Sequence, residues 1–364
     1  MRTRWRWTAV VAACLVVPAA GPGPGADPAA ASAAATAPVE RARFLMGTRL
    51  VIEASGPRAE ESIDRAFGEV ERLDQVLSNW RDDSEIALLN RAAAEGAVTC
   101  SADLFGAVAG SLTWAEKTDG AFDPTVEPLV RRLGLRGDEG RLRGAAPEAP
   151  QGPGPDPIGW RLVEIRPDAK SVRFLAPGVG IDFGGIGKGI ALDAAAGILK
   201  GAGVSAARLD FGGQVLVFGR GPDDGGWIIG LSDPRDRDHL VGTFVLRAGS
   251  IATSGNSERA AGGPDGPRSH LLDPRLGAAA RFDGSLTVVA PDATSADALS
   301  TALFVMGPDR GLAYAADHRL DVLYLRRDRD GALVRRGRGA LAGSAPGDSF
   351  PTTQSPGQPG EPHS

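Results

Sequence analysis

Residues 180–193 read GIDFGGIGKGIALD, in which five glycines surround the single lysine Lys188. Glycine lets a backbone approach a ligand closely, and a lysine in such a turn supplies a point charge for phosphate. A nucleoside-triphosphate loop, G-x-x-x-x-G-K-[ST], is excluded because Asp182 stands at its first glycine and Gly189 follows the lysine. A dinucleotide-binding G-x-G-x-x-G turn is excluded because Ile190 replaces its last glycine. The stretch alone therefore predicts a phosphate contact and no particular reaction.

A carboxylate and a hydroxyl recur four residues apart in APDATSADALSTALFVMG, residues 290–307. If this segment is a helix, Asp297 and Thr301 lie on one face of it. Magnesium prefers oxygen ligands and often combines one or two protein groups with water and substrate phosphates. The alternative is an ordinary exposed polar pair in the first turns of a helix, and the spacing alone leaves it open.

Two further stretches carry polar side chains suited to an anionic ligand or to proton transfer. In SIATSGNSER, Thr253 and Ser254 offer hydroxyl groups in front of a glycine. In SHLLDPRLG, His270 precedes Asp273 by three residues, and a histidine whose pKa lies near neutrality can serve as a general base. A structural histidine that closes a turn is an equal alternative. Neither a G-x-S-x-G turn nor a cysteine–histidine metal spacing occurs in the chain.

The stretch TDGAFDPTVEPLV, residues 118–130, contains an Asp123-Pro124 pair typical of a turn. On local chemistry, Asp123 or Thr125 is expected to accept hydrogen bonds from exposed amide groups of this loop. A direct functional role has no support from this stretch alone.

The elements that must position these residues are a mixture of helices and strands. An amphipathic helix is predicted from Pro57 to residue 80, a short one at 84–90, one capped by Ser101 and ended before Gly120, and others at 190–200 and 295–306. Strands are predicted at 41–54, 206–219, 227–231, 243–252, 285–290 and 321–326, with a hairpin around Pro167. Because no steady strand–helix alternation appears, the fold class is expected to be α+β.

The ends of the chain differ from this folded part in composition. Residues 1–20 combine three arginines with a short apolar run, which is the form of a secretory signal and is shorter than the roughly 20 residues of a spanning helix. Lipid attachment at Cys14 is an open alternative; if the leader is cleaved beyond it, Cys100 is the last cysteine and a disulfide framework is excluded. We expect a linker at 21–39, one domain at 40–340 with an exposed insertion at 136–158, and a disordered tail at 341–364. The net charge of −5 argues against a nucleic-acid surface.

Taken in order, the motifs resemble those of one family. They are MGT at 46–48, SNWRDDSEIALLN at 78–90, DGAFDPTVEPL at 119–129, IDFGGIGKGIALD at 181–193, LDFGGQVLVFG at 209–219, IATSGNSER at 251–259, HLLDPRLG at 270–277 and TSADALSTALFVMG at 294–307. Together they closely resemble the ApbE family, the FAD:protein FMN transferases, over roughly residues 40 to 330. The resemblance implies a mixed, T-fold-like architecture.

The family resemblance also implies a reaction. Its members depend on Mg²⁺, cleave the pyrophosphate of FAD and attach FMN through a phosphoester to a threonine or serine of a partner protein, releasing AMP. That partner would be an FMN-binding domain or a membrane redox subunit. The protein would be exported, at the outer face of the cytoplasmic membrane or in the periplasm, with a lipid-anchored form as the alternative. An FAD diphosphatase, or a flavin-binding lipoprotein without catalysis, are the other functions considered.

Carried onto this sequence, the resemblance assigns Asp297, Thr301 and the carbonyl of Gly187 as metal ligands. His270, Lys188 and Asp297 are implied as catalytic, with His270 the base and Lys188 beside the pyrophosphate. The residues implied in FAD binding are Met46, Trp80, Asp123, Lys188, Asp193, Thr253, Ser254 and His270.

Three departures of this chain from the family pattern matter for its function. Gln214 replaces an aspartate in the GGD motif, Ser257 stands where an aromatic residue is frequent, and Ile190 replaces a common tyrosine. We expect these changes to alter FAD affinity or the choice of acceptor, and activity to survive them.

Overall fold

The structure is a computed structural model, and it describes residues 37–135, 156–222, 225–256, 261–263, 266–268 and 270–346. The predicted leader, Cys14, most of the linker, most of the insertion and the chain beyond 346 lie outside these residues. The first strand begins at Val39 and the last ends at Pro346, so regular structure enters the segment expected to be a tail. None of the helices in the described ranges combines the length and the apolar character that a membrane-spanning helix requires.

The fold is built on one eight-stranded sheet, in the spatial order β1-β2-β6-β7-β10-β15-β16-β17. Every neighbouring pair of these strands is antiparallel, which confirms the α+β class. The strand bounds are Val39–Leu45 (β1), Thr48–Ser55 (β2), Ala206–Phe211 (β6), Gln214–Phe218 (β7), Gly249–Gly255 (β10), Ser285–Ala290 (β15), Asp321–Arg327 (β16) and Leu333–Arg338 (β17).

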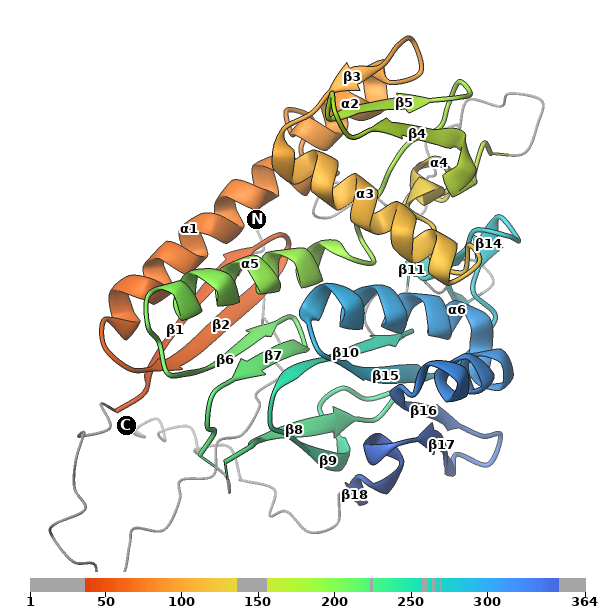
Figure 1. Cartoon of the computed structure of the whole chain (residues 1–364). Coiled ribbons are helices and arrows are strands. Elements are labelled where there is room, and N and C mark those ends of the chain that lie inside the picture. The colour runs from red at the N-terminus through yellow and green to blue at the C-terminus, as the bar shows by residue number, and fades with distance from the viewer. Residues whose placement is uncertain are drawn as a thin grey trace, which may run out of the picture.

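Three helices cover one face of this sheet, as Figure 1 shows: α1 (Ala59–Leu77), α5 (Gly187–Gly201) and α6 (Ala293–His318). The predicted apolar face of α1 is buried, with Ile63, Phe67 and Val70 at most 1% exposed. Burial of each such side chain stabilises the fold by about 1.5–3 kcal/mol. The sheet and these helices enclose the main core and fix where α5 and α6 meet.

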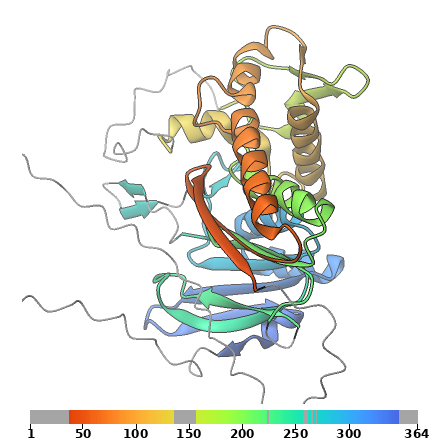
Figure 2. The ribbon, with the colours of Figure 1, turned by 90° about the vertical axis from the view of Figure 1, so that its left-hand side faces the viewer.

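The opposite face of the sheet is covered by a second, smaller sheet (Figure 2), with strands in the order β18-β9-β8. Its strands are Trp227–Ser232 (β8), Leu240–Leu246 (β9) and Ala345–Pro346 (β18). Trp227 and Ile229 of the small sheet belong to a second core with Val215 and Val217 of the large one. The molecule is therefore layered, with helices, large sheet and small sheet in succession.

A third group of elements lies beyond the C-terminal end of α1, at the top of Figure 1. The helices are α2 (Glu85–Ala92), α3 (Ala102–Lys117) and α4 (Glu127–Arg132), with a sheet of β3 (Val98–Thr99), β4 (Val163–Arg166) and β5 (Ser171–Phe174). Ser101 caps α3 as predicted, because its Oγ accepts a hydrogen bond from the N–H of Leu104 at 3.2 Å. Cys100 beside it is a buried free thiol, and burial raises its pKa to about 11.

The remaining short elements join these layers. They are the hairpins β11 (Ala261–Gly263) with β12 (Gly266–Arg268) and β13 (Leu272–Asp273) with β14 (Ala278–Ala279), and the 3₁₀-helices η2 (Pro124–Val126), η3 (Trp160–Leu162) and η4 (Ala340–Gly343).

Several sequence predictions about element boundaries were wrong. The strands predicted at 206–219 and 243–252 each span two strands, β6 with β7 and β9 with β10. The single strand predicted at 41–54 is the hairpin β1–β2, because Met46 and Gly47 both adopt positive φ, at 45° and 75°. Pro57, predicted as a first-turn residue, precedes α1, whose N-cap Arg58 is itself left-handed. Alternating apolar residues continue across the Met46-Gly47 turn, so the sequence pattern did not mark it.

Candidate active site

The candidate site lies where the N-termini of α5 and α6 touch. A Cβ atom on Gly189, in the first turn of α5, would lie 2.4 Å from the carbonyl oxygen of Ala293 in the first turn of α6. No side chain fits at that separation, so the contact requires glycine at this position. This close approach brings the lysine of the glycine-rich stretch to the carboxylate predicted on α6.

Asp297 is the charged centre of the site. It is 5% exposed, and its Oδ2 accepts a hydrogen bond from the backbone N–H of Gly189 at 3.0 Å. Its Oδ1 lies 3.3 Å from Nζ of Lys188. The positive end of α5 and the lysine thus both stabilise the buried carboxylate. The Lys188 side chain is 31% exposed, so its ammonium group remains accessible to a second anion.

The other two predicted metal ligands lie around Asp297. Thr301 is one helical turn further along α6, and a Cβ on Gly185 would lie 2.9 Å from its Oγ1. Gly187 follows Gly185 by two residues, and the turn residue Met46 approaches it, with Cε 3.9 Å from the position of a Gly187 Cβ. The structure therefore gathers the glycine-rich segment, Asp297 and Thr301 into one place.

These donors fit a hard cation that takes much of its coordination from a ligand. The side chains supply one carboxylate and one hydroxyl, and both are oxygen donors of the kind that Mg²⁺ prefers. Within the described ranges, no group of three or more His, Cys, Asp or Glu side chains is placed to hold a metal ion. A cation bound at Asp297 and Thr301 would thus need water and phosphate oxygens to complete its shell.

The first turn of α6 is held by groups from two other elements. Asp193 of α5 accepts hydrogen bonds from the N–H groups of Ala293 and Thr294, each at 2.8 Å. Gln214, at the start of β7, donates from Nε2 to the carbonyl of Ala293 at 2.7 Å. Asp193 was predicted to line an FAD pocket, and in the structure its carboxylate caps α6. The longer amide side chain of Gln214 reaches a carbonyl, which a carboxylate in its place would repel.

Two asparagines that the sequence analysis did not single out fix the start of the glycine-rich segment. Asn90 of α2 accepts from the N–H of Ile181 at 2.8 Å and donates to its carbonyl at 2.9 Å. Asn79, just after α1, donates to the same carbonyl at 2.8 Å. Both asparagines stand in the motif SNWRDDSEIALLN, but only the fold shows that they meet residue 181, because their partner is about a hundred residues away.

Replacement of Asn90 by alanine is expected to loosen the glycine-rich segment. The change leaves the N–H of Ile181, a fully buried residue, without its side-chain acceptor, at a cost of about 1–2 kcal/mol. Thermal unfolding would measure this as a lower Tm. Asn90→Asp is the second variant. It keeps the oxygen that accepts from the Ile181 N–H but replaces the donating amide group with an oxygen, which faces the Ile181 carbonyl. An unchanged Tm in both variants would contradict the assigned contact.

The two hydroxyl residues of β10 point to opposite faces of the sheet. Ser254 is buried and its Oγ lies 2.9 Å from Oγ of Ser300, which in turn donates to the carbonyl of Asp297. Thr253 is exposed and its Oγ1 pairs with that of Thr287 on β15 at 2.9 Å. Alternation along the strand therefore brings Ser254 to α6 and directs Thr253 away from it.

Asp123 accepts hydrogen bonds from its own loop and from the start of η3. Its Oδ1 accepts from the N–H and the hydroxyl of Thr125, at 2.8 and 2.6 Å, and its Oδ2 accepts from the N–H of Trp160 at 2.9 Å. Burial raises the pKa of Asp123, although these three hydrogen bonds favour its ionised form. This is the capped loop that local chemistry indicated. Trp80, in contrast to the buried Asp123, is 58% exposed. It directly follows Asn79, whose amide group binds the glycine-rich segment at Ile181.

His270 lies two residues before β13 and is half-buried. Its hairpin is held by Asp273, whose carboxylate accepts from Nε and Nη2 of Arg275, both at 2.9 Å. Arg132 of α4 donates to the carbonyl of Gly277 in the hairpin turn at 3.0 Å. The hairpin is therefore tied to α4, and Asp273 holds its turn through Arg275.

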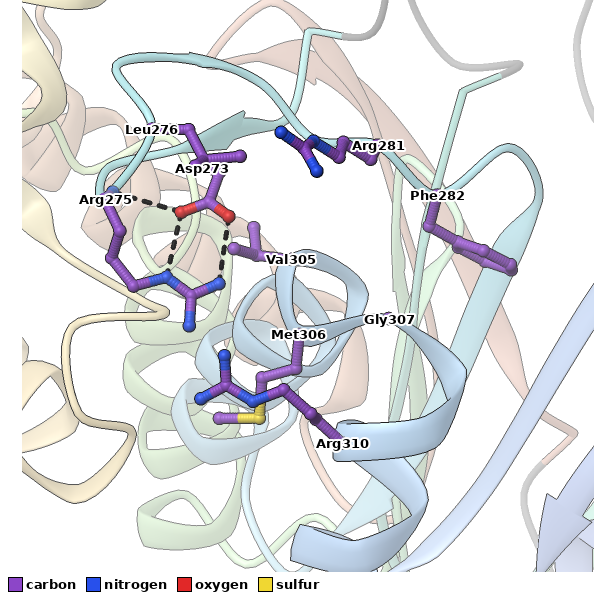
Figure 3. Close-up of a pocket in the computed structure, with 9 residues that line it drawn as sticks. All are labelled: Asp273, Arg275, Leu276, Arg281, Phe282, Val305, Met306, Gly307 and Arg310. Atoms are coloured by element: carbon purple, nitrogen blue, oxygen red, sulfur yellow. Dashed lines mark hydrogen bonds and ion pairs between the residues drawn. The ribbon is translucent and has the colours of Figure 1, made fainter.

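A cavity of about 390 Å³ separates the β13–β14 hairpin from α6, and Figure 3 shows its walls. Asp273, Arg275 and Leu276 come from the hairpin, and Val305, Met306 and Arg310 from α6. Val305 follows Thr301 by four residues, so the cavity begins one helical turn beyond the candidate metal ligands.

Fold and site together define an α+β protein in which a glycine-rich helix N-terminus, a lysine and a carboxylate–hydroxyl pair form one candidate site for an anion and a cation. Residues 46–324 match the model of the ApbE family. The chain belongs to that family.

Three similar proteins illustrate the relationship. A protein named FAD:protein FMN transferase from Treponema pallidum is 29% identical over 317 residues, covering 79% of this chain and 84% of the relative. One of the same name from Klebsiella pneumoniae is 30% identical over 288 residues, covering 77% and 81%. The crystal structure of the ApbE protein from Thermotoga maritima superposes with a TM-score of 0.70 at 30% identity, covering 82% of this chain and 96% of that one.

Proposed function

We propose that this protein is a Mg²⁺-dependent FAD:protein FMN transferase. The observation that carries the proposal is the buried Asp297 carboxylate, held against Lys188 and the N-terminus of α5 with Thr301 one turn away. The names of the relatives support the reaction class. Binding of FAD alone would not require a buried carboxylate next to a lysine at a cation site. Such a group of charges stabilises the negative charge that develops on the phosphates during bond cleavage.

In the proposed reaction, a threonine or serine hydroxyl of a partner protein attacks the phosphorus on the FMN side of the FAD pyrophosphate. A new P–O bond forms, the bond from this phosphorus to the bridging oxygen breaks, and that oxygen leaves with AMP. Magnesium held by Asp297, Thr301 and the Gly187 carbonyl would supply positive charge at the phosphates when bound. Lys188 adds its charge to the same oxygens, and His270 accepts the proton of the attacking hydroxyl.

The partner is proposed to be an exported or membrane-bound redox protein, because the leader-like residues 1–20 would carry this chain to the same side of the membrane. Met46 and Trp80 are proposed to contact the flavin, with Trp80 offering an exposed aromatic face at the edge of the site.

The decisive experiment incubates the purified protein with FAD, Mg²⁺ and an FMN-binding acceptor domain, then records in-gel flavin fluorescence after denaturation. A fluorescent acceptor band together with released AMP supports the transferase. AMP and free FMN without a labelled acceptor would make the protein an FAD diphosphatase. Absence of AMP, with FAD still bound, would leave only flavin binding.

His270→Gln is expected to lower transfer to the acceptor by about 10²-fold, because a general base of this kind contributes at least that much. The rate of transfer to the acceptor should be measured for both proteins at saturating FAD and Mg²⁺. A variant that retains the wild-type rate would exclude His270 as the base.

A further inference from the structure

The cavity between the β13–β14 hairpin and α6 is lined by more arginines than its acidic residues neutralise. Three arginines line it: Arg275, Arg281 and Arg310. Arg275 is neutralised by the two-point contact with Asp273. Arg281 and Arg310 are exposed, and within the described part of the chain neither makes an ion pair or a side-chain hydrogen bond. Asp309, the acidic neighbour of Arg310, pairs with Arg336 at 2.8 Å, so it does not neutralise Arg310.

The arginines make the cavity suited to an anionic group. In Figure 3 the side chains of Arg281 and Arg310 extend from different walls toward the side of the cavity where Asp273 and Arg275 lie. A guanidinium presents a planar set of donors that matches a carboxylate or a phosphate. Apolar atoms of Leu276, Phe282 and Met306 complete the walls, which suits an anion attached to a larger, partly apolar molecule.

The place of the cavity in the fold relates it to the reaction. One wall belongs to the hairpin that directly follows His270, and the other begins at Val305, one turn of α6 beyond Thr301. A molecule that presents a hydroxyl to His270 would therefore extend past the cavity, and the residues flanking that hydroxyl would pass near Arg281 and Arg310.

We propose that this cavity binds an acidic side chain in the segment of the acceptor protein that flanks the modified threonine or serine. The inference rests on the proposed function, since it concerns the substrate of the same site. It identifies Arg281 and Arg310 as residues that select acceptors by charge. They are distinct from the groups that bind FAD and the cation.

The first test measures steady-state kinetics for Arg281→Gln, Arg310→Gln and the double variant, with the FMN-binding acceptor domain and FAD varied separately. The KM for the acceptor is expected to rise at least about ten-fold while the KM for FAD is unchanged, because a hydrogen bond to a charged group is lost. Arg65→Gln is the matched control, as Arg65 is an exposed arginine on α1. A rise in the KM for FAD would place FAD in the cavity. Unchanged KM values for both substrates would show that the cavity does not bind the acceptor. Either result overturns the proposal.

The second test does not require transfer, so it separates this inference from the proposed function. Fluorescence anisotropy would compare a labelled short peptide that carries aspartates around a central threonine with its twin in which asparagines replace them. Tighter binding of the aspartate peptide to the wild type, lost in the double variant and kept in Arg65→Gln, supports the proposal even if no FMN is transferred. Equal binding of the two peptides to the wild type overturns it even if the protein proves an active transferase.

Discussion

Asp297→Ala is expected to abolish turnover of FAD, with a loss of at least about 10³-fold. The carboxylate accepts hydrogen bonds from both Lys188 and the Gly189 N–H at the start of α5. Removing it takes away the acceptor of the Gly189 N–H and the proposed cation ligand. Charge stabilisation of this kind is commonly the largest single contribution to catalysis. The rate of AMP release at saturating FAD and Mg²⁺ would measure the effect.

The matched control for this change is Asp317→Ala, which removes an exposed carboxylate near the other end of the same helix. It is expected to leave AMP release unchanged. The Mg²⁺ concentration for half-maximal activity should be determined for any residual activity of the Asp297 variant. If that variant turns over FAD at the wild-type rate, the cation is held elsewhere and the site assigned to α6 is wrong.

Gly189→Ala is expected to lower the stability of the fold strongly. Its new Cβ would stand 2.4 Å from the carbonyl oxygen and 2.7 Å from the carbonyl carbon of Ala293, and backbone atoms cannot rotate away as a side chain can. The α5–α6 contact must therefore open, at a cost of about 3 kcal/mol, the upper part of the usual range for overpacking. A fall in Tm and a parallel loss of AMP release are expected, because the same displacement separates Lys188 from Asp297.

Gly197→Ala provides the contrast within the same helix. Nothing lies within 4 Å of a Cβ at Gly197, so the substitution meets no obstacle and is expected to raise stability by up to about 1 kcal/mol through helix propensity. A destabilised Gly197→Ala variant, or a Gly189→Ala variant as stable as the wild type, would contradict the packing described for α5.

Patterns within a single element were predictable from the sequence. The apolar face of α1 follows from the spacing of Ile63, Phe67 and Val70, and the cap of α3 from Ser101, because both are local properties of the chain. The pairing of the glycine-rich stretch with Asp297 came from the family resemblance. Neither the glycine-rich stretch nor the segment around Asp297 indicates by itself that the two are in contact, because 108 residues separate Gly189 from Asp297 in the sequence.

The roles of individual polar side chains were less predictable, because they depend on which backbone groups the fold leaves without partners. The resemblance implied that Asp193 lines the FAD pocket, and nothing in its local sequence predicted that it also caps a helix that begins 100 residues later. Thr253 and Ser254 were treated as a pair, although neighbouring residues of a strand face opposite ways and only Ser254 reaches α6. The contacts of Asn79 and Asn90 with residue 181 could not be predicted, because no sequence motif marks an amide side chain that binds a distant backbone group.

The capping of α6 by distant segments has a consequence for how activity arises during folding. Asp297 is positioned by contacts with Lys188 and Gly189, and its helix by Asp193 and Gln214, over sequence separations of 79 to 109 residues. Closing such long loops is slow relative to forming local helices. A chain with most of its helices formed would therefore still lack the assembled carboxylate, and turnover would appear only with the last tertiary contacts. We therefore expect catalytic activity to require the fully folded chain, so that a partly folded molecule would not consume FAD before it is able to recognise its acceptor.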